Sequence, residues 1–416
     1  MSKGINRGRR EALLALTDVL EEGAYANLRL QSLDCAKEER AFVSALVYTA
    51  LEHVRWADYM LEHYVKRQKK LVRNLLRLGV CELFFMDTAP YAAVNEWVQL
   101  CRDMGKAPSA SLVNAVLRRM LREKDALPPL PEAPAERLSI VYGMPQWLME
   151  EWIDRFGAEK AEDMLRPQPP MLEVRGQYPF TVEDLLSQFP QGKRGNLCPN
   201  CLLLPPGSLT PAAPLFLEGK AVFQGEGAMA ICEFMGDMRG KKVLDGCAAP
   251  GGKSAYLWSL FEGDIDLSCW ELHPHRTMLM EETFRRLKVQ AQCAQRDASL
   301  LYPEYGEAFD GVLLDVPCSG LGLRLTKPDI GLHKEEEQVQ SLVKIQAAIL
   351  KACCAYVKRG GVLVYSTCTL SRRENEDQVK EFLDAHPDFR LEEERQLLPP
   401  QDGLGGFYMA RMRRCM

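Results

Sequence analysis

The sequence predicts an α/β protein in which a doubly wound, mostly parallel sheet follows an all-helical domain and a small α+β module. Three observations lead to this fold class. From Lys241 onward, short β-rich runs alternate with helical segments. Before Lys124, apolar residues recur at helical spacing, and a stretch rich in proline and glycine follows. We therefore expect three parts, residues 1–126, 127–236 and 237–416.

Length and composition narrow the class of protein. A chain of 416 residues is longer than a single core supports, because such cores stop growing at about 250–300 residues. Its 47% hydrophobic and 26% charged residues are typical of a soluble globular protein. We find no signal-peptide pattern and no apolar run of the about 20 residues that span a bilayer. We expect a cytoplasmic protein without a membrane partner, whose 14 cysteines are reduced.

The first part should be a bundle of helices with a basic face. Its apolar positions follow helical spacing at Ala12, Leu16 and Val19, at Phe42, Leu46 and Ala50, and at Leu75, Leu78, Cys81 and Phe85. Up to Lys124 there are 20 Lys and Arg against 15 Asp and Glu, although the whole chain carries a net charge of −5. The most basic segment, 66–77, suits either a phosphate backbone or solvent.

A proline-rich break at Leu127–Pro134 ends the helical part, since proline removes a backbone donor and stops a helix. The stretch 167–217 is punctuated by proline and glycine and contains short apolar runs. This pattern predicts a small α+β module.

In the third part, the predicted strands are Lys242–Asp245, Asp266–Glu271, Phe309–Asp315 and Gly361–Ser366. Each strand ends in an acid or a hydroxyl, and doubly wound sheets bind ligands at the carboxyl ends of their strands. We therefore expect a site at this edge of the sheet.

The loop after the first strand indicates a nucleoside ligand. Val243–Ser254 runs from a strand through small residues into a helix, so backbone amides can approach a ligand closely. Cys247 stands where the phosphate-binding motif G-x-x-x-x-G-K-[ST] needs its first glycine, and the dinucleotide motif G-x-G-x-x-G is absent. Glu271, about 20 residues later, is placed to accept from ribose hydroxyls. Asp297 could accept from an adenine amine or be an ordinary surface acid.

Two cysteines follow neighbouring strands, Cys318 in Asp315-Val-Pro-Cys-Ser-Gly320 and Cys368 in Ser366-Thr-Cys-Thr369. Either thiol alone would be read as core packing. Together with Asp315 they suit methylation of cytosine, whose C5 becomes nucleophilic only after a thiolate adds to C6. Asp315 could hold and protonate N3, and the second thiol could help to remove the C5 proton.

Five stretches in order carry a resemblance to a known family. They are Asp245–Lys253, Asp315–Gly322, Lys327-Pro-Asp-Ile330, Tyr365–Leu370 followed by Glu374-Asn-Glu376, and Gly405–Arg411. The chain resembles the Sun-type RNA cytosine-5 methyltransferases, in particular the RsmB-like type that acts on bacterial 16S ribosomal RNA. The resemblance covers nearly the whole chain.

The resemblance implies S-adenosylmethionine as cofactor and gives each residue a role. The residues implied to bind the cofactor are Cys247, Ala248, Ala249, Pro250, Gly251, Gly252, Lys253, Glu271, Asp297 and Asp315. It further implies that Cys368 attacks C6 and that Cys318 promotes product release. DNA cytosine-5 methyltransferases instead use the Pro-Cys cysteine as nucleophile, and spacing alone does not choose between the two thiols.

The N-terminal part resembles the NusB-like RNA-binding domain in Leu75–Val80, Ala93–Glu96 and Leu112–Arg119. Two stretches of the middle module depart from the pattern. Glu173–Gln177 replaces an Arg-Val-Asn-like stretch, and Phe223–Gly227 replaces a Gln-Asp-Glu-Ala-Ser-like one. We expect a monomer that acts on small-subunit ribosomal RNA, with 23S ribosomal RNA or tRNA as alternative substrates.

Two rival functions and a metal site were weighed. An NTPase using Lys253 and Ser254 conflicts with the one-residue misfit of the loop. An RNA-binding assembly or antitermination factor would leave Asp315 and both cysteines without a purpose. Cys198-Pro-Asn-Cys201 lacks a second ligand pair at zinc spacing, so we predict no metal.

Overall fold

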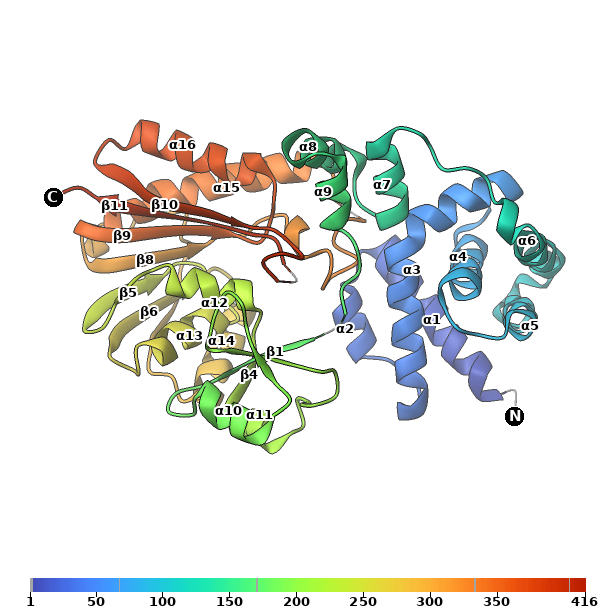
Figure 1. The fold of residues 1–416 in the computed structure, drawn as a ribbon, viewed down its shortest axis with the longest axis horizontal. Helices are drawn as coiled ribbons and strands as arrows, with labels where there is room; N and C mark the ends of the chain where they lie inside the picture. The colour runs from blue at the N-terminus through green and yellow to red at the C-terminus, as the bar shows by residue number, and fades with distance from the viewer. Residues whose placement is uncertain (1–2, 67, 170, 333, 404) are drawn as a thin grey trace. The chain divides into compact units, whose positions relative to one another are not determined.

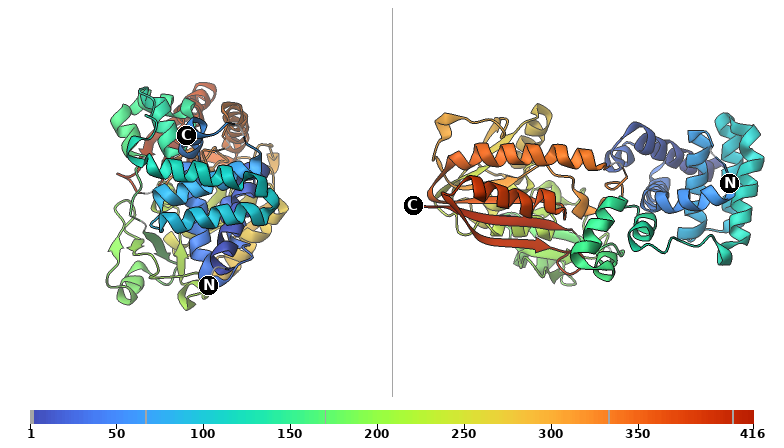
Figure 2. Two further views of the ribbon diagram at one scale, coloured as in Figure 1. Left: turned by 90° about the vertical axis from the view of Figure 1, so that its right-hand side faces the viewer. Right: turned by 90° about the horizontal axis from the view of Figure 1, so that it is seen from above.

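The computed structural model describes residues 3–66, 68–169, 171–332, 334–403 and 405–416. The chain forms two compact units, shown with their elements in Figures 1 and 2. The first comprises Met1–Leu165 and Lys327–Lys334, and the second comprises Arg166–Thr326 and Glu335–Met416. The three-part division at residues 126 and 236 stays a prediction. Within the described ranges, no helix is both long and apolar enough to cross a membrane.

The first unit is helical, as predicted for its part up to residue 126; its last three helices lie in the stretch that was predicted to be linker and α+β module. Its helices are α1 (Lys3–Glu22), α2 (Ala26–Gln31), α3 (Lys37–Tyr64), α4 (Lys70–Phe85), α5 (Pro90–Cys101), α6 (Ala110–Arg122), α7 (Pro134–Tyr142), α8 (Gln146–Phe156) and α9 (Ala158–Asp163). Leu16, Leu46 and Leu75 come from three of these helices and are buried in one core. The spacing of apolar residues therefore marked the inward faces of these helices, except at Phe85, which is exposed.

Ion pairs within the first unit occupy part of the basic segment 66–77. Arg73 and Arg77 reach Asp58 at 3.0 and 2.6 Å, and Lys70 reaches Glu21 at 2.6 Å. Lys66 and Lys69, by contrast, are exposed just before α4. Arg73 and Arg77 thus stabilise the bundle, while Lys66 and Lys69 face solvent.

The middle module is the predicted small α+β structure, and its described residues form one antiparallel sheet in the order β2-β3-β1-β4. Its elements are β1 (Leu172–Gly176), α10 (Val182–Gln188), β2 (Lys193–Arg194), β3 (Cys201–Leu204), α11 (Pro214–Leu217) and β4 (Ala221–Phe223). Thr181 and Asp184 form a capping box that starts α10. α12 (Glu226–Glu233) then leads into the large sheet.

The two stretches that depart from the family pattern contact each other. The Glu226 backbone N–H donates to Glu173 Oε2 at 3.1 Å. The buried Arg175 guanidinium donates to the side chains of Gln224 and Gln177, each at 2.6 Å. Burial lowers the pKa of Arg175 to about 10. The replacements therefore form one joined hydrogen-bond network.

The described residues of the third part form a sheet of seven strands in the order β10-β11-β9-β8-β5-β6-β7. The strands are β5 (Lys241–Asp245), β6 (Ile265–Glu271), β7 (Gln292–Gln295), β8 (Phe309–Asp315), β9 (Val357–Thr367), β10 (Phe389–Leu397) and β11 (Phe407–Arg414). β9, β8, β5, β6 and β7 are parallel, and β11 and β10 add to the β9 edge in antiparallel fashion. The mostly parallel sheet is therefore confirmed.

Helices cover both faces of this sheet. They are α13 (Gly252–Leu260), α14 (Pro274–Leu287), α15 (Glu336–Cys353) and α16 (Glu376–Ala385). Val243 packs with residues of α13 and α14, whereas its neighbour Leu244 packs with residues of α15 and α16. Successive residues of one strand thus enter two cores, as expected for a doubly wound sheet.

Candidate functional site

The loop between β5 and α13 is shaped by two glycines that differ in their surroundings. Gly251 has φ +98°, and a Cβ added there would lie 2.8 Å from Phe284 Cε1. A Cβ on Gly252 would meet no atom within 4 Å, so this position faces open space. Gly251 is therefore required by the fold, whereas Gly252 leaves room for a ligand.

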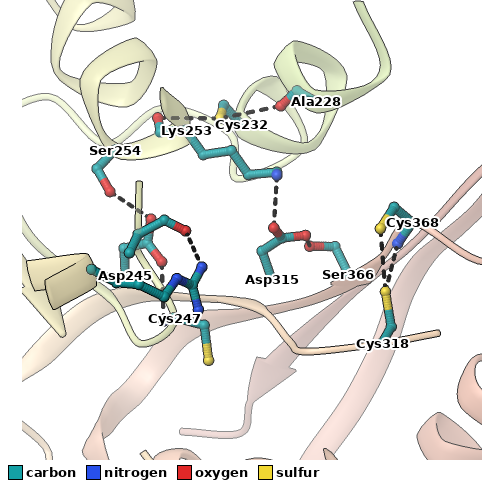
Figure 3. A network of polar contacts seen from close by, with 12 residues as sticks. Ala228, Cys232, Asp245, Cys247, Lys253, Ser254, Asp315, Cys318, Ser366 and Cys368 are labelled. Carbon is teal, nitrogen blue, oxygen red and sulfur yellow. Dashed lines mark hydrogen bonds and ion pairs between the residues drawn. The ribbon is translucent and has the colours of Figure 1, made fainter. Parts of the chain in front are cut away.

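Asp245, at the end of β5, ties this loop to the sheet. Ser254 Oγ donates to Asp245 Oδ2 at 2.6 Å, and the Cys247 backbone N–H donates to Oδ1 at 3.3 Å (Figure 3). Burial raises the pKa of the Asp245 carboxyl to about 6. Asp245 is not among the site residues predicted from the sequence, although its place at a strand end is a usable signal.

The rest of the predicted cofactor loop lies against the end of β6. Ala248 and Ala249 are buried, Cys247 is half-buried and Pro250 is exposed. The Ala248 N–H donates to the Trp270 carbonyl at 2.9 Å, and Arg276 Nη2 donates to the Ala249 carbonyl at 2.8 Å.

Glu271 is the last residue of β6, and Asp297 follows the end of β7. Glu271 is buried; its Oε1 accepts from the His273 N–H at 3.0 Å, and its Oε2 lies 3.2 Å from Arg276 Nη1. Asp297 Oδ1 accepts from the N–H and hydroxyl of Ser299 at 2.9 and 2.6 Å. Both carboxylates are fixed in orientation and keep lone pairs for further donors.

Lys253, in the first turn of α13, forms an ion pair with Asp315, at the end of β8. Lys253 Nζ lies 2.7 Å from Asp315 Oδ2, and Ser366 Oγ donates to Asp315 Oδ1 at 3.1 Å (Figure 3). Burial lowers the pKa of the Lys253 ammonium, but the Asp315 carboxylate outweighs it, so the net pKa is raised. The sequence reasoning named both residues but neither their pairing nor Ser366.

The two cysteines lie side by side. Cys318 Sγ is 3.3 Å from Cys368 Sγ, and the Cys368 backbone N–H also donates to Cys318 Sγ at 3.3 Å (Figure 3). The hydrogen bond with Cys368, followed by burial, raises the pKa of the Cys318 thiol well above its ordinary value. β8 and β9 are paired from Asp315 to Ser366, which brings the segments that follow them together.

These groups could hold a nucleoside that carries hydroxyls, an amine and a carboxylate. Asp245, Glu271 and Asp297 offer acceptor oxygens at the ends of three adjacent strands. α13 begins at Gly252, and the backbone amides of a helix N-terminus favour a carboxylate. The paired thiols lie one and two strands away from β5, beside the Lys253–Asp315 pair.

Comparison with protein families gives two matches that divide the chain. Residues 235–413 match the family "16S rRNA methyltransferase RsmB/F", and residues 6–122 match the NusB family. A protein of Bacillus subtilis (strain 168), named "Probable ribosomal RNA small subunit methyltransferase B", is 33% identical over 97% of this chain and 98% of its own length. A Xylella fastidiosa (strain 9a5c) protein, "Ribosomal RNA small subunit methyltransferase B", is 33% identical over 90% of this chain and 91% of its own.

Solved structures share the fold. A structure described as "Crystal Structure of PH0851" superposes with a TM-score of 0.81 at 21% identity, covering 98% of this chain and 99% of that one. The structure of "NSun6 from Pyrococcus horikoshii with SFG" has a TM-score of 0.58 at 22% identity, covering 65% of this chain and 98% of that one.

Proposed function

Because the chain belongs to the 16S rRNA methyltransferase RsmB/F family and is an S-adenosylmethionine-dependent rRNA methyltransferase, we propose that it methylates C5 of a cytosine through a covalent adduct. The observation that carries the proposal is the pair of thiols, Cys318 and Cys368, whose sulfur atoms lie 3.3 Å apart. Methylation of C5 needs one group that adds to C6 and a second that acts on the C5 proton. Two thiols at this separation can reach adjacent ring carbons.

Cys368 is the nucleophile in this proposal. The hydrogen bond with Cys368 and burial raise the pKa of Cys318, so this thiol keeps its proton at neutral pH and is a poor nucleophile. The Cys368 backbone N–H donates to Cys318 Sγ, so Cys318 lies beside the attacking sulfur. The Cys368 thiol gives up its proton, and its Sγ bonds to C6. After methylation the C5 proton passes to solvent through the Cys318 thiol, which takes up one proton as it releases another, and the bond from Sγ to C6 breaks.

Lys253 and Asp315 act at N3 of the cytosine ring in this proposal. When the sulfur adds to C6, the ring nitrogen N3 must take up a proton for C5 to become an enamine carbon. Asp315 contacts N3, held by Ser366 on one oxygen and by Lys253 on the other. Asp315 passes to N3 the proton that the Cys368 thiol gives up, while the Lys253 ammonium keeps its own proton and stabilises the Asp315 carboxylate. On release, the N3 proton returns to the same pair.

The cofactor site would use the loop Cys247–Lys253, with Glu271 on the ribose hydroxyls and Asp297 on the adenine amine. Bound S-adenosylmethionine supplies an electrophilic methyl group to C5. The fit rests on the open space at Gly252 and on the acceptor oxygens of Glu271 and Asp297, since hydroxyls and amines are donors.

The direct test is the chemical identity of the product. Unmodified small-subunit rRNA, large-subunit rRNA and tRNA would each be incubated with the enzyme and methyl-labelled S-adenosylmethionine, then digested to nucleosides. The proposal predicts label in 5-methylcytidine from small-subunit rRNA. Label in another nucleoside would contradict the cytosine-5 chemistry, and label only in tRNA or large-subunit rRNA would change the substrate.

A further inference from the structure

Glu374 is a fully buried carboxylate beside the two cysteines. It lies in a short 3-10 turn, Arg372–Glu374, six residues after Cys368. Within the part of the chain that the structure describes, no ion pair joins it to a cation, and its contacts are with neutral donors. Burying a carboxylate in this way is costly unless each oxygen is hydrogen-bonded, so its partners indicate what it is for.

Ser319, the residue after Cys318, provides two of these hydrogen bonds. Its backbone N–H donates to Glu374 Oε1 at 2.8 Å, and its hydroxyl donates to Oε2 at 2.6 Å. Ser319 Oγ also lies 2.9 Å from the hydroxyl of Thr369, the residue after Cys368. Because Ser319 has one hydroxyl hydrogen, which goes to the carboxylate, the Thr369 hydroxyl must donate to Ser319. Glu374 thus joins the neighbours of both cysteines.

Gln346 on α15 completes the link from the other side. The two amide hydrogens of Gln346 are used at 3.0 Å each, one on Glu374 Oε1 and one on the carbonyl of Pro317, the residue before Cys318. Its own Oε1 is buried with no hydrogen-bond partner among the described residues. Burying the Gln346 carbonyl oxygen without a partner is unfavourable, so the side chain is kept in this position by the two hydrogen bonds that its amide donates.

We infer that Glu374 is a positioning residue that fixes Cys318 against Cys368 and is needed for the release of the methylated product. The inference rests on the proposed function, because it assigns Glu374 to the step in which Cys318 acts. Residues on each side of Cys318, Pro317 and Ser319, are held by the Glu374 network, so losing it frees the Cys318 backbone at both neighbours. The Cys368 segment has a separate support, since Asn375 bonds the Thr367 hydroxyl at 2.6 Å and the Thr369 carbonyl at 3.0 Å.

Because Glu374 supports the Cys318 segment and Asn375 supports the Cys368 segment, losing Glu374 should impair product release and spare adduct formation. Without Glu374, Cys368 still adds to the ring, because Asn375 holds its segment. Cys318 loses its fixed place, and displacement of a reacting group by about 1 Å can cost up to about hundredfold in rate. The adduct should therefore form and then persist.

The experiment compares Glu374→Ala, Glu374→Gln and Asp377→Asn with the parent, in the full chain, on unmodified small-subunit rRNA. Glutamine keeps one acceptor for Ser319 N–H and Gln346, and its amide can donate to Ser319 Oγ if the hydroxyl chain reverses. Asp377 is an exposed carboxylate nearby that pairs with Arg372 and lies outside the network, so it is the matched control. Each variant is assayed for methyl transfer in a single turnover and for covalent RNA on a denaturing gel.

We expect Glu374→Ala to raise the trapped adduct about tenfold with methyl transfer in one turnover changed less than about threefold. Glu374→Gln should restore release, and Asp377→Asn should match the parent. Equal loss of transfer and release in Glu374→Ala, or failure of glutamine to rescue, would overturn the inference.

Two further variants keep the outcome interpretable. If Glu374→Ala does not fold, Ser319→Ala removes the hydroxyl bond to Glu374 Oε2 and the link to Thr369 but keeps the backbone N–H bond, so a smaller excess of adduct is expected; its absence counts against the inference. Cys318→Ala in parallel tests the proposed function alone. If Cys318→Ala traps no adduct, the proposed function fails, whereas an adduct in Cys318→Ala without one in the Glu374 and Ser319 variants refutes only the role of Glu374.

Discussion

Cys318 and Cys368 are 50 residues apart in the chain, and their sulfur atoms lie 3.3 Å apart. Each follows the end of a parallel strand, and the pairing of β8 with β9 places those ends at one edge of the sheet. The Lys253–Asp315 ion pair lies at the same edge. The proposed nucleophile Cys368, the second thiol Cys318 and the Lys253–Asp315 pair, which is proposed to contact N3, therefore lie around one substrate position.

The two loop glycines should separate fold stability from cofactor affinity. Gly251→Ala adds a Cβ at φ +98° and 2.8 Å from Phe284, so we expect the free energy of unfolding to fall by about 1–3 kcal/mol. Gly252→Ala meets no atom within 4 Å and should leave stability within about 0.5 kcal/mol while weakening S-adenosylmethionine binding. Urea unfolding and calorimetric titration measure the two effects. Equal cofactor affinity in the parent and Gly252→Ala would remove Gly252 from the cofactor site.

Removal of the ammonium at the catalytic pair should slow the reaction rather than prevent binding of RNA. Lys253→Met leaves Asp315 without its cation, and we expect kcat to fall by about 10²–10⁴-fold. Lys242→Met, at an exposed lysine paired with Asp266, is the control and should keep parental kcat. Steady-state assays on rRNA would decide, and a kcat for Lys253→Met within threefold of the parent would exclude the role assigned to the pair.

The raised pKa of Lys253 also has a consequence for pH. A lysine with a raised folded-state pKa contributes stability that is fully present below its unfolded pKa and is lost only above its folded one. The free energy of unfolding of the parent relative to Lys253→Met should therefore be constant from pH 6 to pH 9, and a difference that changes over this range in urea unfolding would contradict the raised pKa.

Asp245 should make stability depend on pH in the opposite sense to an ordinary ion-paired acid. Burial raises its pKa from 3.8 to about 6, so the protonated form is favoured in the folded state. Its contribution to stability is present below pH 3.8 and is lost as the pH rises towards 6. Between pH 4.5 and pH 7 the free energy of unfolding of the parent relative to Asp245→Asn should fall by about 2 kcal/mol. A difference that is flat or rises over this range in urea unfolding would refute the shift.

Within the basic segment of the first unit, we expect some cationic side chains to bind RNA and others to stabilise the fold. Lys66 and Lys69 are exposed, so replacing both with alanine should weaken rRNA binding and reduce the slope of log affinity against log salt by about one to two. Arg77 pairs with Asp58 at 2.6 Å, so Arg77→Ala should cost about 2 kcal/mol of stability instead. Filter binding at several salt concentrations tests this, and an unchanged slope in the lysine variant would place RNA elsewhere.

Most of the sheet could be predicted because its central strands are buried on both faces. β5, β6, β8 and β9 read as short apolar runs that end in polar residues, and all four are present. β7, β10 and β11 were not predicted. β7 has four residues that are exposed or half-buried at an edge, and β10 carries exposed charges through its centre, so neither shows an apolar run. β11 pairs antiparallel to β9, a partnership that local pattern does not encode.

The candidate residues could be named from strand ends, but their contacts depend on strand order. The order β9-β8-β5 brings Lys253 to Asp315 and Cys318 to Cys368, and the sequence alone does not determine that order. Glu374 illustrates the other limit. A glutamate in a charged stretch reads as exposed, and only its hydrogen bonds to Ser319 and Gln346 account for its complete burial.

The roles of the two thiols are tested most directly by the covalent adduct. Parent, Cys318→Ala, Cys368→Ala and the double variant would be incubated with S-adenosylmethionine and unmodified small-subunit rRNA, and protein–RNA species counted on a denaturing gel. We predict a stable adduct in Cys318→Ala, none in Cys368→Ala or the double variant, and a loss of turnover of at least about thousandfold in Cys368→Ala. An adduct that persists without Cys368 and disappears without Cys318 would reverse the two assignments.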